Sequence, residues 1–312
     1  MRWVMYQSGD GDERAGLVLD GNIHGLASGT AVIDLLGDDG ERMDAAAQQA
    51  RESPSEVVAY ATATLGAPIR PRQIRDCLTF LQHLRNARAA IGGELDPGWE
   101  QIPAFYFSNT TGVLGPRDDV AISPGCEQFD YELEIGAVIG REGADLHPDE
   151  AASHICGYTI FCDWSARDLQ MHEMKLMLGP AKGKDGANTV GPMLVTADEL
   201  EPYRSGPSYH LEMKGFVNGE LVSQGHWDQM DWSWGEVLAY ASRGTRLLPG
   251  ELIGSGTVPT GCLIEHWAMN GPEKFRGWLQ PDDVVRLEVE QLGAIEQRVV
   301  AALPVHRLRT GF

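Results

Sequence analysis

Two stretches of this chain place acidic side chains on strands that are otherwise apolar. In residues 130–140 the apolar side chains fall on one face of a predicted strand, and Glu132 and Glu134 fall on the other. About twenty residues later, the apolar run 157–162 ends at Asp163 and turns into a predicted helix. Because a buried carboxylate is costly without a partner, the fold must give these acids either a shared partner or solvent.

The three acids could converge on one point. Converging carboxylates repel each other unless a cation lies between them. The sequence therefore predicts a Mg²⁺, Mn²⁺ or Ca²⁺ site formed by Glu132, Glu134 and Asp163. The alternative is a solvated outer strand face, which is the usual meaning of alternating acids. Spacing alone does not decide, because Glu288 and Glu290 repeat it with no acid-ended strand after them.

Composition favours a β-rich fold and excludes two classes of partner. The 312 residues are 43% hydrophobic and include 37 glycines and 17 prolines, which is enough for a large core, or two domains, with many turns. The net charge of −20 argues against nucleic acid and anionic membranes. We expect no signal peptide or membrane span, and five cysteines without CxxC spacing indicate reduced thiols in a cytoplasmic protein.

The stretch 66–71, rich in Gly and Pro, predicts a linker between a small N-terminal domain over residues 1–70 and a larger domain over residues 71–312 that contains the three acids. Apolar periodicity predicts helices at 30–36, 56–65, 76–91, 165–176 and 234–243. It predicts strands at 3–6, 16–19, 22–26, 104–107, 191–196, 210–217, 220–224, 251–254, 262–267, 284–290 and 297–303. Asn218 and Gly219 predict a tight hairpin between two of these strands.

Several polar residues could have either a structural or a functional role on sequence alone. His83 lies beside the apolar stripe of the predicted helix 76–91, where a histidine more often packs than acts as a base. Arg167 would usually be a surface cation on its helix. Lys184 lies in the glycine-rich loop 179–186, which lacks the glycine spacing and following Ser or Thr of a phosphate loop. The loop 254–261 lacks dinucleotide-binding spacing and is not expected to open a helix.

Five short motifs then occur in a fixed order. They read Glu-Leu-Glu at 132–134, Asp-Trp-Ser-Ala-Arg-Asp-Leu-Gln at 163–170, Lys-Gly-Lys-Asp at 182–185, Gly-Thr at 256–257 and Gly-Cys-Leu-Ile-Glu at 261–265. Together they make residues 74–303 similar to the fumarylacetoacetate hydrolase family, the second motif being the specific one. The resemblance implies an α+β, β-rich fold: a mixed β-sandwich roll after a small, variable N-terminal α+β domain, usually as a homodimer.

The resemblance also implies roles for individual residues. Carboxylates at Glu132, Glu134 and Asp163 would hold a divalent metal, most simply Mg²⁺, with Mn²⁺ or Ca²⁺ as alternatives. A pair formed by His83 and Glu265 would activate water. The positions that would contact substrate are Arg167, Gln170, Lys184 and Thr257.

Three positions depart from the family pattern. Shorter acylpyruvase members carry a glutamate three residues after the histidine, where this chain has Asn86, so Glu265 is assigned to the pair. Larger hydrolases carry a fourth acid where this chain has Thr79, which implies one more water in the metal shell. Gly186 replaces a phenylalanine, which would widen the pocket or loosen the loop that carries Lys184.

These parts predict a metal-dependent hydrolase that cleaves a carbon–carbon bond in a β-diketone or 2,4-dioxo acid, a small anionic oxo-acid substrate. Such a substrate chelates a hard cation through two oxygens. His83 would deprotonate water, Lys184 would stabilise the oxyanion or protonate the leaving carbanion, and Arg167 with Gln170 would hold a carboxylate. Two alternatives stay open: a metal-dependent decarboxylase or keto–enol isomerase of a small oxo acid, and a non-catalytic dimeric binding protein with a decayed site.

Overall fold

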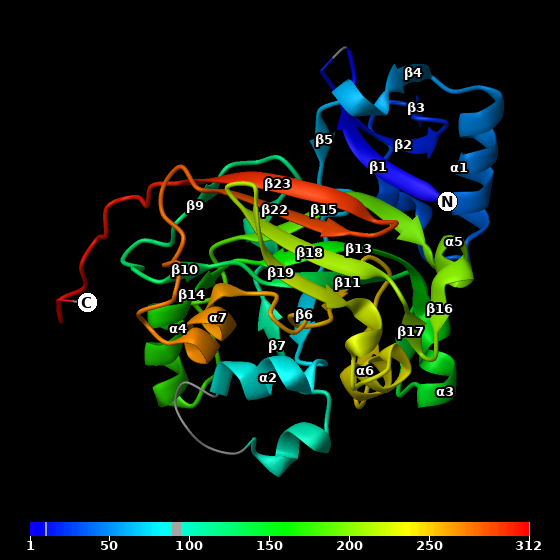
Figure 1. Ribbon diagram of the computed structural model, residues 1–312. Helices are drawn as coiled ribbons and strands as arrows, with labels where there is room; N and C mark the ends of the chain where they lie inside the picture. Colours follow the sequence, from blue (N-terminus) through cyan, green and yellow to red (C-terminus); the bar gives the residue numbers. More distant parts are fainter. Residues whose placement is uncertain (10, 89–94, 312) are drawn as a thin grey trace.

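The fold is described by a computed structural model, which covers residues 1–9, 11–88 and 95–311. One long mixed sheet of twelve strands runs through the molecule (Figure 1). Its path is β4 (Glu56–Ala59), β3 (Asn22–Gly25), β2 (Glu13–Leu19), β1 (Arg2–Gln7), β15 (Asn188–Thr196), β13 (Ile155–Asp163), β11 (Leu133–Ile139), β21 (Leu252–Gly254), β6 (Ile74–Cys77) and β7 (Phe105–Ser108). The short strands β5 (Leu65–Gly66) and β8 (Val113–Leu114) pair with β1 and β15.

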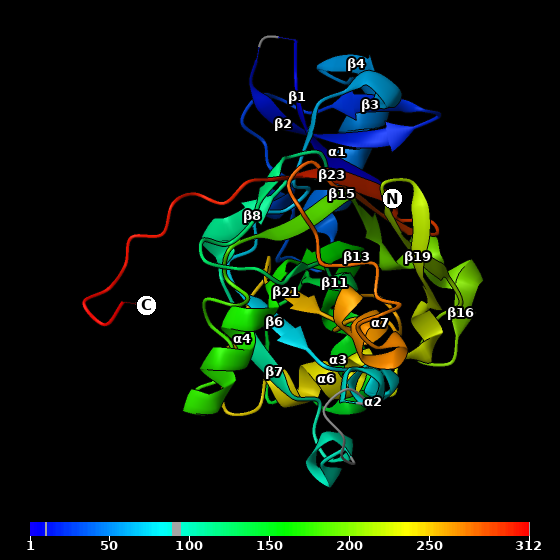
Figure 2. The ribbon, with the colours of Figure 1, turned by 60° about the vertical axis from the view of Figure 1, so that its left-hand side comes forward.

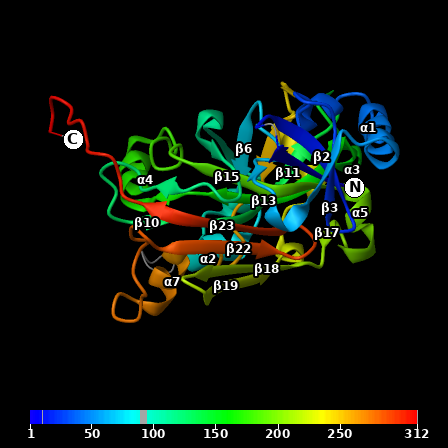
Figure 3. The ribbon, with the colours of Figure 1, turned by 90° about the horizontal axis from the view of Figure 1, so that it is seen from above.

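A second sheet of five strands packs against β11, β13 and β15 (Figure 3). Its order is β19 (Glu220–His226), β18 (Glu212–Val217), β22 (Val284–Val289), β23 (Gly293–Val300) and β9 (Val120–Ala121). Asn218 and Gly219 both have positive φ, 53° and 80°, as a tight hairpin turn requires, so that prediction is confirmed. The larger apolar core fills the space between the sheets, and the predicted β-rich α+β fold is confirmed.

The remaining elements are short. Three two-stranded pairs join β10 (Phe129–Asp130) to β14 (Ser165–Ala166), β12 (Gly143–Ala144) to β20 (Arg246–Leu247), and β16 (Arg204–Ser205) to β17 (Ser208–Tyr209). The α-helices in the described part of the chain are α1 (Glu41–Glu52), α2 (Leu81–Arg88), α3 (Pro148–Ala151), α4 (Arg167–Glu173), α5 (Ala197–Leu200), α6 (Trp234–Ala241) and α7 (Leu263–Asn270). In the view of Figure 2, α4 and α7 lie on the two sides of β6 and β21.

The predicted helix at 56–65 is wrong. This segment forms the strand β4, a single 3₁₀ turn at Tyr60–Thr62 and the strand β5. The helix predicted at 30–36 is a single 3₁₀ turn at Val32–Leu35, and the first α-helix in the described part of the chain is α1, whose stripe of small or flexible side chains was not predicted. Met43, Ala46, Ala47 and Ala50 are its buried residues, at the spacing of one helical face.

Two predicted elements next to the site are also wrong. The helix expected at 76–91 begins only at Leu81, because the residues before it form β6 between β21 and β7; residues 89–91 lie outside the described residues. The strand expected at 262–267 is the helix α7, so the loop 254–261 does lead into a helix. The carboxylate of Asp130 accepts the first helical N–H groups, from Leu263 at 2.7 Å and Ile264 at 3.1 Å. A cap from a residue so distant in sequence leaves no local signal.

The N-terminal strands continue the large sheet, since β1 pairs with β15 at Arg2–Val195 and Trp3–Leu194. A division of the chain near residue 70 therefore stays a prediction. Residues 301–311 extend away from the body of the molecule and are exposed (Figures 1 and 2). Among the described residues, no helix combines the length and apolar character needed to cross a bilayer.

Candidate active site

Glu132 and Glu134 lie at the start of β11, which has β13 on one side and β21 on the other. Glu132 is 5% exposed and Glu134 is fully buried. In contrast, the equally spaced Glu290 is exposed, and Glu288 is only half-buried. The interpretation of Glu132 and Glu134 as part of a solvated strand face is therefore wrong, and these acids point into the protein.

Asp76 is an acid that the sequence analysis missed. It lies in β6, and its carboxylate oxygens lie within 4.8 Å of those of Glu132 and Glu134. The neighbouring strand makes room with Gly254, where an added Cβ would collide with Asp76 Oδ1 and come within 3.1 Å of Glu134 Oε2. The sequence signal for Asp76 is an acid next to apolar residues, but the predicted helix at 76–91 places Asp76 at a helix start, where an acid is ordinary.

Thr79 occupies the position where larger family members carry a fourth acid. Thr79 is buried and donates its hydroxyl to the backbone carbonyl of Ser255. Asp76, three residues earlier, brings a carboxylate to the cluster instead. Asp76 is therefore a candidate for the fourth acid, and a metal shell with one more water stays a prediction.

Asp163 ends β13 and joins the cluster through two donors rather than through direct oxygen contact. Its Oδ2 accepts hydrogen bonds from the Tyr106 hydroxyl and, at 2.8 Å, from Lys184 Nζ. The same Tyr106 hydroxyl lies 2.7 Å from Asp76 Oδ2, and Lys184 also pairs with Glu132. Tyr106 and Lys184 thus tie Asp76, Asp163 and Glu132 into one network, and Glu134 lies beside Asp76 and Glu132. Tyr106 was not singled out from the sequence, where it is one aromatic residue in an apolar strand.

The loop carrying Lys184 is held closely. Lys184 is 3% exposed, and its backbone carbonyl accepts from the hydroxyl of Ser108 at 3.2 Å. An added Cβ at Gly183 would lie 2.7 Å from the backbone of Gln170, which explains the glycine between the two lysines. Gly186 does not line the cavity and faces Ser123, so neither a wider pocket nor a loose lysine is observed.

Arg167 is buried rather than a surface cation. It donates to Asp130 Oδ2 at 2.8 Å and to Glu132 Oε1 at 2.8 Å, and its third nitrogen reaches Gln170 Oε1 at 3.1 Å. Because Asp130 also caps α7, Arg167 connects the acid cluster to the helix that carries Glu265.

The charge balance of this region fits a bound cation. Burial raises the pKa of Asp76, Glu134 and Asp163 above the usual carboxyl range, and repulsion between the neighbouring acids raises it further. Burial also acts on Glu132, but the charges of Lys184 and Arg167 hold its pKa below that range. Oδ1 of Asp76 and Oδ1 of Asp163 are buried without a hydrogen-bond partner. Hard divalent cations prefer such oxygen ligands, so these residues fit Mg²⁺, Mn²⁺ or Ca²⁺.

His83 and Glu265 form the predicted pair. Nδ1 of His83 lies 3.0 Å from Glu265 Oε2, and both side chains are buried. The other carboxylate oxygen of Glu265 accepts from the side chain of Asn86 at 2.9 Å and from the backbone N–H of Thr260 at 3.0 Å. Asn86 therefore occupies the place next to the pair and orients its carboxylate, while Cys262 donates its thiol to Oε2 at 3.3 Å.

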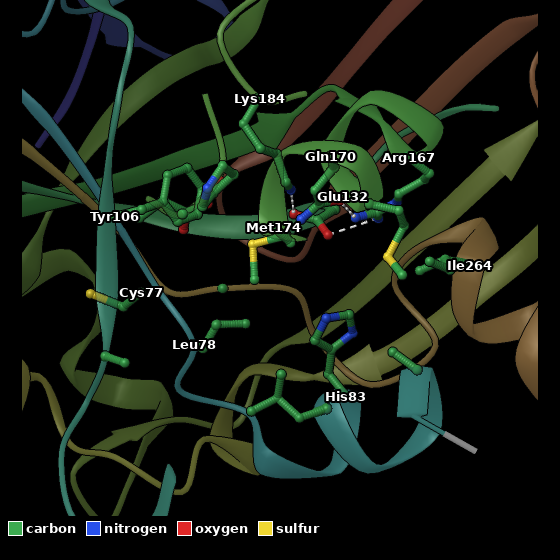
Figure 4. Close-up of a pocket in the computed structure, with 18 of the residues that line it drawn as sticks. Cys77, Leu78, His83, Tyr106, Glu132, Arg167, Gln170, Met174, Lys184 and Ile264 are labelled. Atoms are coloured by element: carbon green, nitrogen blue, oxygen red, sulfur yellow. Dashed lines mark hydrogen bonds and ion pairs between the residues drawn. The ribbon is translucent and has the colours of Figure 1, made fainter. Parts of the chain in front are cut away.

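One cavity of about 720 Å³ brings the two groups together. Its wall includes Asp76, Glu132, Glu134, His83, Arg167, Gln170 and Lys184. Figure 4 shows His83 on one side of the cavity and Glu132, Arg167, Gln170 and Lys184 on the other. Thr257 is not brought to this wall: it is buried behind the cluster, and its hydroxyl lies 3.5 Å from Glu134.

A mixed-sheet α+β fold with buried carboxylates facing a histidine–glutamate pair defines a class of enzymes acting on small molecules. The sequence profile of the fumarylacetoacetate (FAA) hydrolase C-terminal family matches residues 72–300. This chain belongs to the fumarylacetoacetate hydrolase family.

Curated relatives and solved structures agree with this assignment. The chain is 29% identical to a mitochondrial oxaloacetate tautomerase of Xenopus laevis, over 96% of this chain and 90% of the relative. It resembles the solved fumarylacetoacetate hydrolase of Exiguobacterium antarcticum, with a TM-score of 0.73 and 25% identity over 96% and 99% of the two chains. The fold also matches a maleylpyruvate hydrolase from Sphingobium sp. SYK-6, solved with manganese(II) and pyruvate, with a TM-score of 0.71 and 21% identity over 97% and 100% of the chains. The family holds hydrolases and tautomerases or isomerases.

Proposed function

We propose that this protein is a divalent-metal-dependent hydrolase that cleaves a carbon–carbon bond in a 2,4-dioxo acid. The observation that carries this proposal is the buried His83–Glu265 pair, which faces the carboxylate cluster across one cavity. A base placed opposite a cation site is what the attack of water on a chelated dicarbonyl requires. The presence of both groups argues against a decayed, non-catalytic site.

The cation site would be formed by Asp76, Glu132, Glu134 and Asp163. A bound divalent cation supplies a Lewis acid that polarises the carbonyl group and stabilises enolate charge. Mg²⁺ is the simplest choice for these oxygen ligands, and Mn²⁺ is supported by the manganese-containing maleylpyruvate hydrolase of the same fold.

His83 would take a proton from the attacking water through its cavity-facing nitrogen. Glu265 would hold the ring by accepting the Nδ1 proton and would stabilise the imidazolium that forms. Asn86 and the N–H of Thr260 keep the second oxygen of Glu265 occupied, which fixes the carboxylate in place. The pair therefore needs no rearrangement to act as a general base.

Lys184 and Arg167 would bind and stabilise the negative charges of the substrate. Lys184 Nζ already lies between two carboxylates. Burial alone would lower the pKa of Lys184, but the charges of Asp163 and Glu132 raise it above its usual value, so Lys184 stays protonated and can stabilise an oxyanion. Arg167 and Gln170 present N–H groups at the same wall, where they would bind the substrate carboxylate.

The test is an assay of acylpyruvates, fumarylpyruvate-like acids and oxaloacetate, with and without chelator, following loss of enol absorbance and quantifying the two acid products. We expect metal-dependent formation of pyruvate plus a second acid. Glu134→Gln should abolish it, whereas the equally spaced but exposed Glu290→Gln should not. Cleavage that persists in chelator, or metal binding with no cleaved product, would contradict the hydrolase assignment.

Keto–enol tautomerisation of a small oxo acid is the second candidate, favoured by the similarity to the Xenopus laevis oxaloacetate tautomerase. This reaction uses the same cation site but no attacking water. Replacing His83 or Glu265 should then spare activity more than replacing a carboxylate of the cluster. Conversion of oxaloacetate between its keto and enol forms, without release of pyruvate from any dioxo acid, would select this function.

A homodimer and a cytoplasmic location remain proposals. The family resemblance supports the homodimer. The cytoplasmic location has no such support, since the Xenopus laevis relative is named as mitochondrial. Size-exclusion chromatography with light scattering measures the oligomeric state directly.

A further inference from the structure

Most of the cavity wall away from the charged residues is apolar. The side chains there come from five separate parts of the chain: Leu84, Phe105, Met174, Ile264 with Trp267, and Trp278. Figure 4 shows Met174 and Ile264 pointing into the space between His83 and Glu132. A substrate that reaches both the cluster and His83 therefore also contacts this apolar wall.

The cavity is larger than the reacting group alone requires. Its volume of about 720 Å³ equals that of roughly two dozen water molecules in the liquid. A carboxylate and two neighbouring carbonyl groups fill only a small part of it, and pockets of this size usually hold ligands of drug-like dimensions. The remaining space must accommodate the group attached to the far carbonyl.

The charges on the wall indicate the character of that group. Among the described residues that line the cavity, the Lys and Arg side chains are Arg88, Arg167 and Lys184. Arg167 and Lys184 both lie against Glu132 beside the cluster, where the proposed function assigns them to the first carboxylate and the oxyanion of the substrate. Arg88, the last residue of α2, is thus the single remaining cation for a second acidic group, against a wall that is otherwise apolar.

We propose that the substrate is a 2,4-dioxo acid whose acyl group is large and apolar, such as an aromatic or medium-chain aliphatic group. This inference rests on the proposed hydrolase function. Water adds its oxygen to the far carbonyl carbon, the bond from that carbon to the methylene carbon breaks, and the bonding electrons pass to the pyruvate enolate, which takes up the proton. The products are an apolar carboxylic acid and pyruvate.

Three substrates test the proposal with the Mn²⁺- or Mg²⁺-loaded full-length protein: acetylpyruvate, benzoylpyruvate and fumarylpyruvate. We expect kcat/KM for benzoylpyruvate to exceed the value for each of the others at least about tenfold, because even one added methylene in a fitting apolar pocket is worth about that factor. A preference for acetylpyruvate would show that the apolar wall does not bind substrate. A preference for fumarylpyruvate would show that Arg88 selects a second carboxylate.

A pair of variants on one segment locates the effect. Met174 lines the cavity and is 50% exposed, whereas Met177 is 90% exposed and does not line it, so a lysine at either place leaves the core intact. Met174→Lys should lower kcat/KM for benzoylpyruvate about tenfold and narrow the difference from fumarylpyruvate. Met177→Lys should change neither value. Equal effects of the two variants would overturn the assignment of Met174 to the acyl site.

The two proposals fail in distinguishable ways. If no dioxo acid is cleaved although the metal binds, the hydrolase function is wrong. The affinities of the same three acids, measured by calorimetry, then still test the apolar site. Benzoylpyruvate should bind most tightly, and an affinity equal to or weaker than that of acetylpyruvate or fumarylpyruvate would refute the site.

Discussion

Replacing Asp76 with asparagine tests the charge balance of the site, because it changes one atom in the cluster and should have opposite effects on the two states of the protein. With metal removed, the variant should be more stable than the wild type, since one buried charge is gone. With metal present, it should bind the cation more weakly, since one oxygen ligand has lost its charge. A residue with a purely structural role would not produce this pair of effects.

The magnitude follows from the distances. The oxygens of Asp76, Glu132 and Glu134 lie within 4.8 Å of one another. Two unit charges at that separation repel by about 3 kcal/mol at an effective dielectric constant of about 20. Proton uptake relieves part of this repulsion, so we expect a gain nearer 1 kcal/mol, or a rise in Tm of about 2 °C. Metal affinity should fall more than about 100-fold, beyond the loss usual for residues behind the ligands.

The pH dependence supplies a further check. Burial raises the pKa of Asp76, Glu134 and Asp163, so the folded protein holds protons that the unfolded chain releases. Their contribution to metal-free stability is therefore complete below about pH 4 and is lost as pH rises through the raised values. The Tm in chelator should fall with rising pH, less steeply for Asp76→Asn than for the wild type.

The measurement is thermal unfolding in chelator and calorimetric titration with Mn²⁺ or Mg²⁺. The matched control is Asp119→Asn, because Asp119 is exposed and pairs with Arg298, and neither residue lines the cavity. This variant should leave metal affinity unchanged and change Tm by less than Asp76→Asn does. A lower Tm for Asp76→Asn in chelator, or unchanged metal affinity, would refute the charge-balance reasoning.

Three further changes probe the rest of the site. His83→Ala should lower kcat by about 10²- to 10⁴-fold while metal affinity, followed by calorimetry, stays nearly intact; equal loss of both would make the histidine a ligand. Asn86→Asp places a second carboxyl beside Glu265 Oε1, where the Asn86 amide now donates a hydrogen bond of 2.9 Å. This variant should lower kcat and shift the pH profile of kcat. An unchanged profile would mean that Asn86 only fills space. Arg167→Met leaves Asp130 and Glu132 without their shared cation. The free energy of unfolding, measured in urea, should fall by about 3–5 kcal/mol. A fall below about 1 kcal/mol would count against a buried ion pair.

Residues that act through local pattern could be predicted from the sequence. Alternation along β11 put Glu132 and Glu134 on one face, and the end of an apolar run placed Asp163 at the end of β13. Family motifs then indicated the pairing of His83 with Glu265, which the structure places 3.0 Å apart. Each of these inferences depends on spacing within one element or one motif.

Residues that act through partners distant in sequence could not be predicted in this way. Asp76 looked like the start of a helix, because nothing near it shows that β21 and β7 pair on its two sides. The helix α7 looked like a strand because its cap, Asp130, precedes it by more than 130 residues. Burial of Arg167 depends on the same Asp130, so a sequence window around the arginine shows only a polar helix.

Asp130 explains why the two halves of the site stay in register. Its Oδ1 accepts the N–H of Leu263 and its Oδ2 those of Ile264 and Arg167, so one buried carboxylate fixes both the start of α7 and the guanidinium. Arg167 in turn holds Glu132 of the cation cluster, while α7 holds Glu265 of the base pair. Since Glu265 also contacts His83, Asp130 connects the cation site to the base pair through one set of buried contacts. Among the residues of the apolar wall, Phe105, Met174 and Trp278 lie outside α2 and α7, so substitutions at these three places can change the acyl site without altering the helices that carry His83 and Glu265.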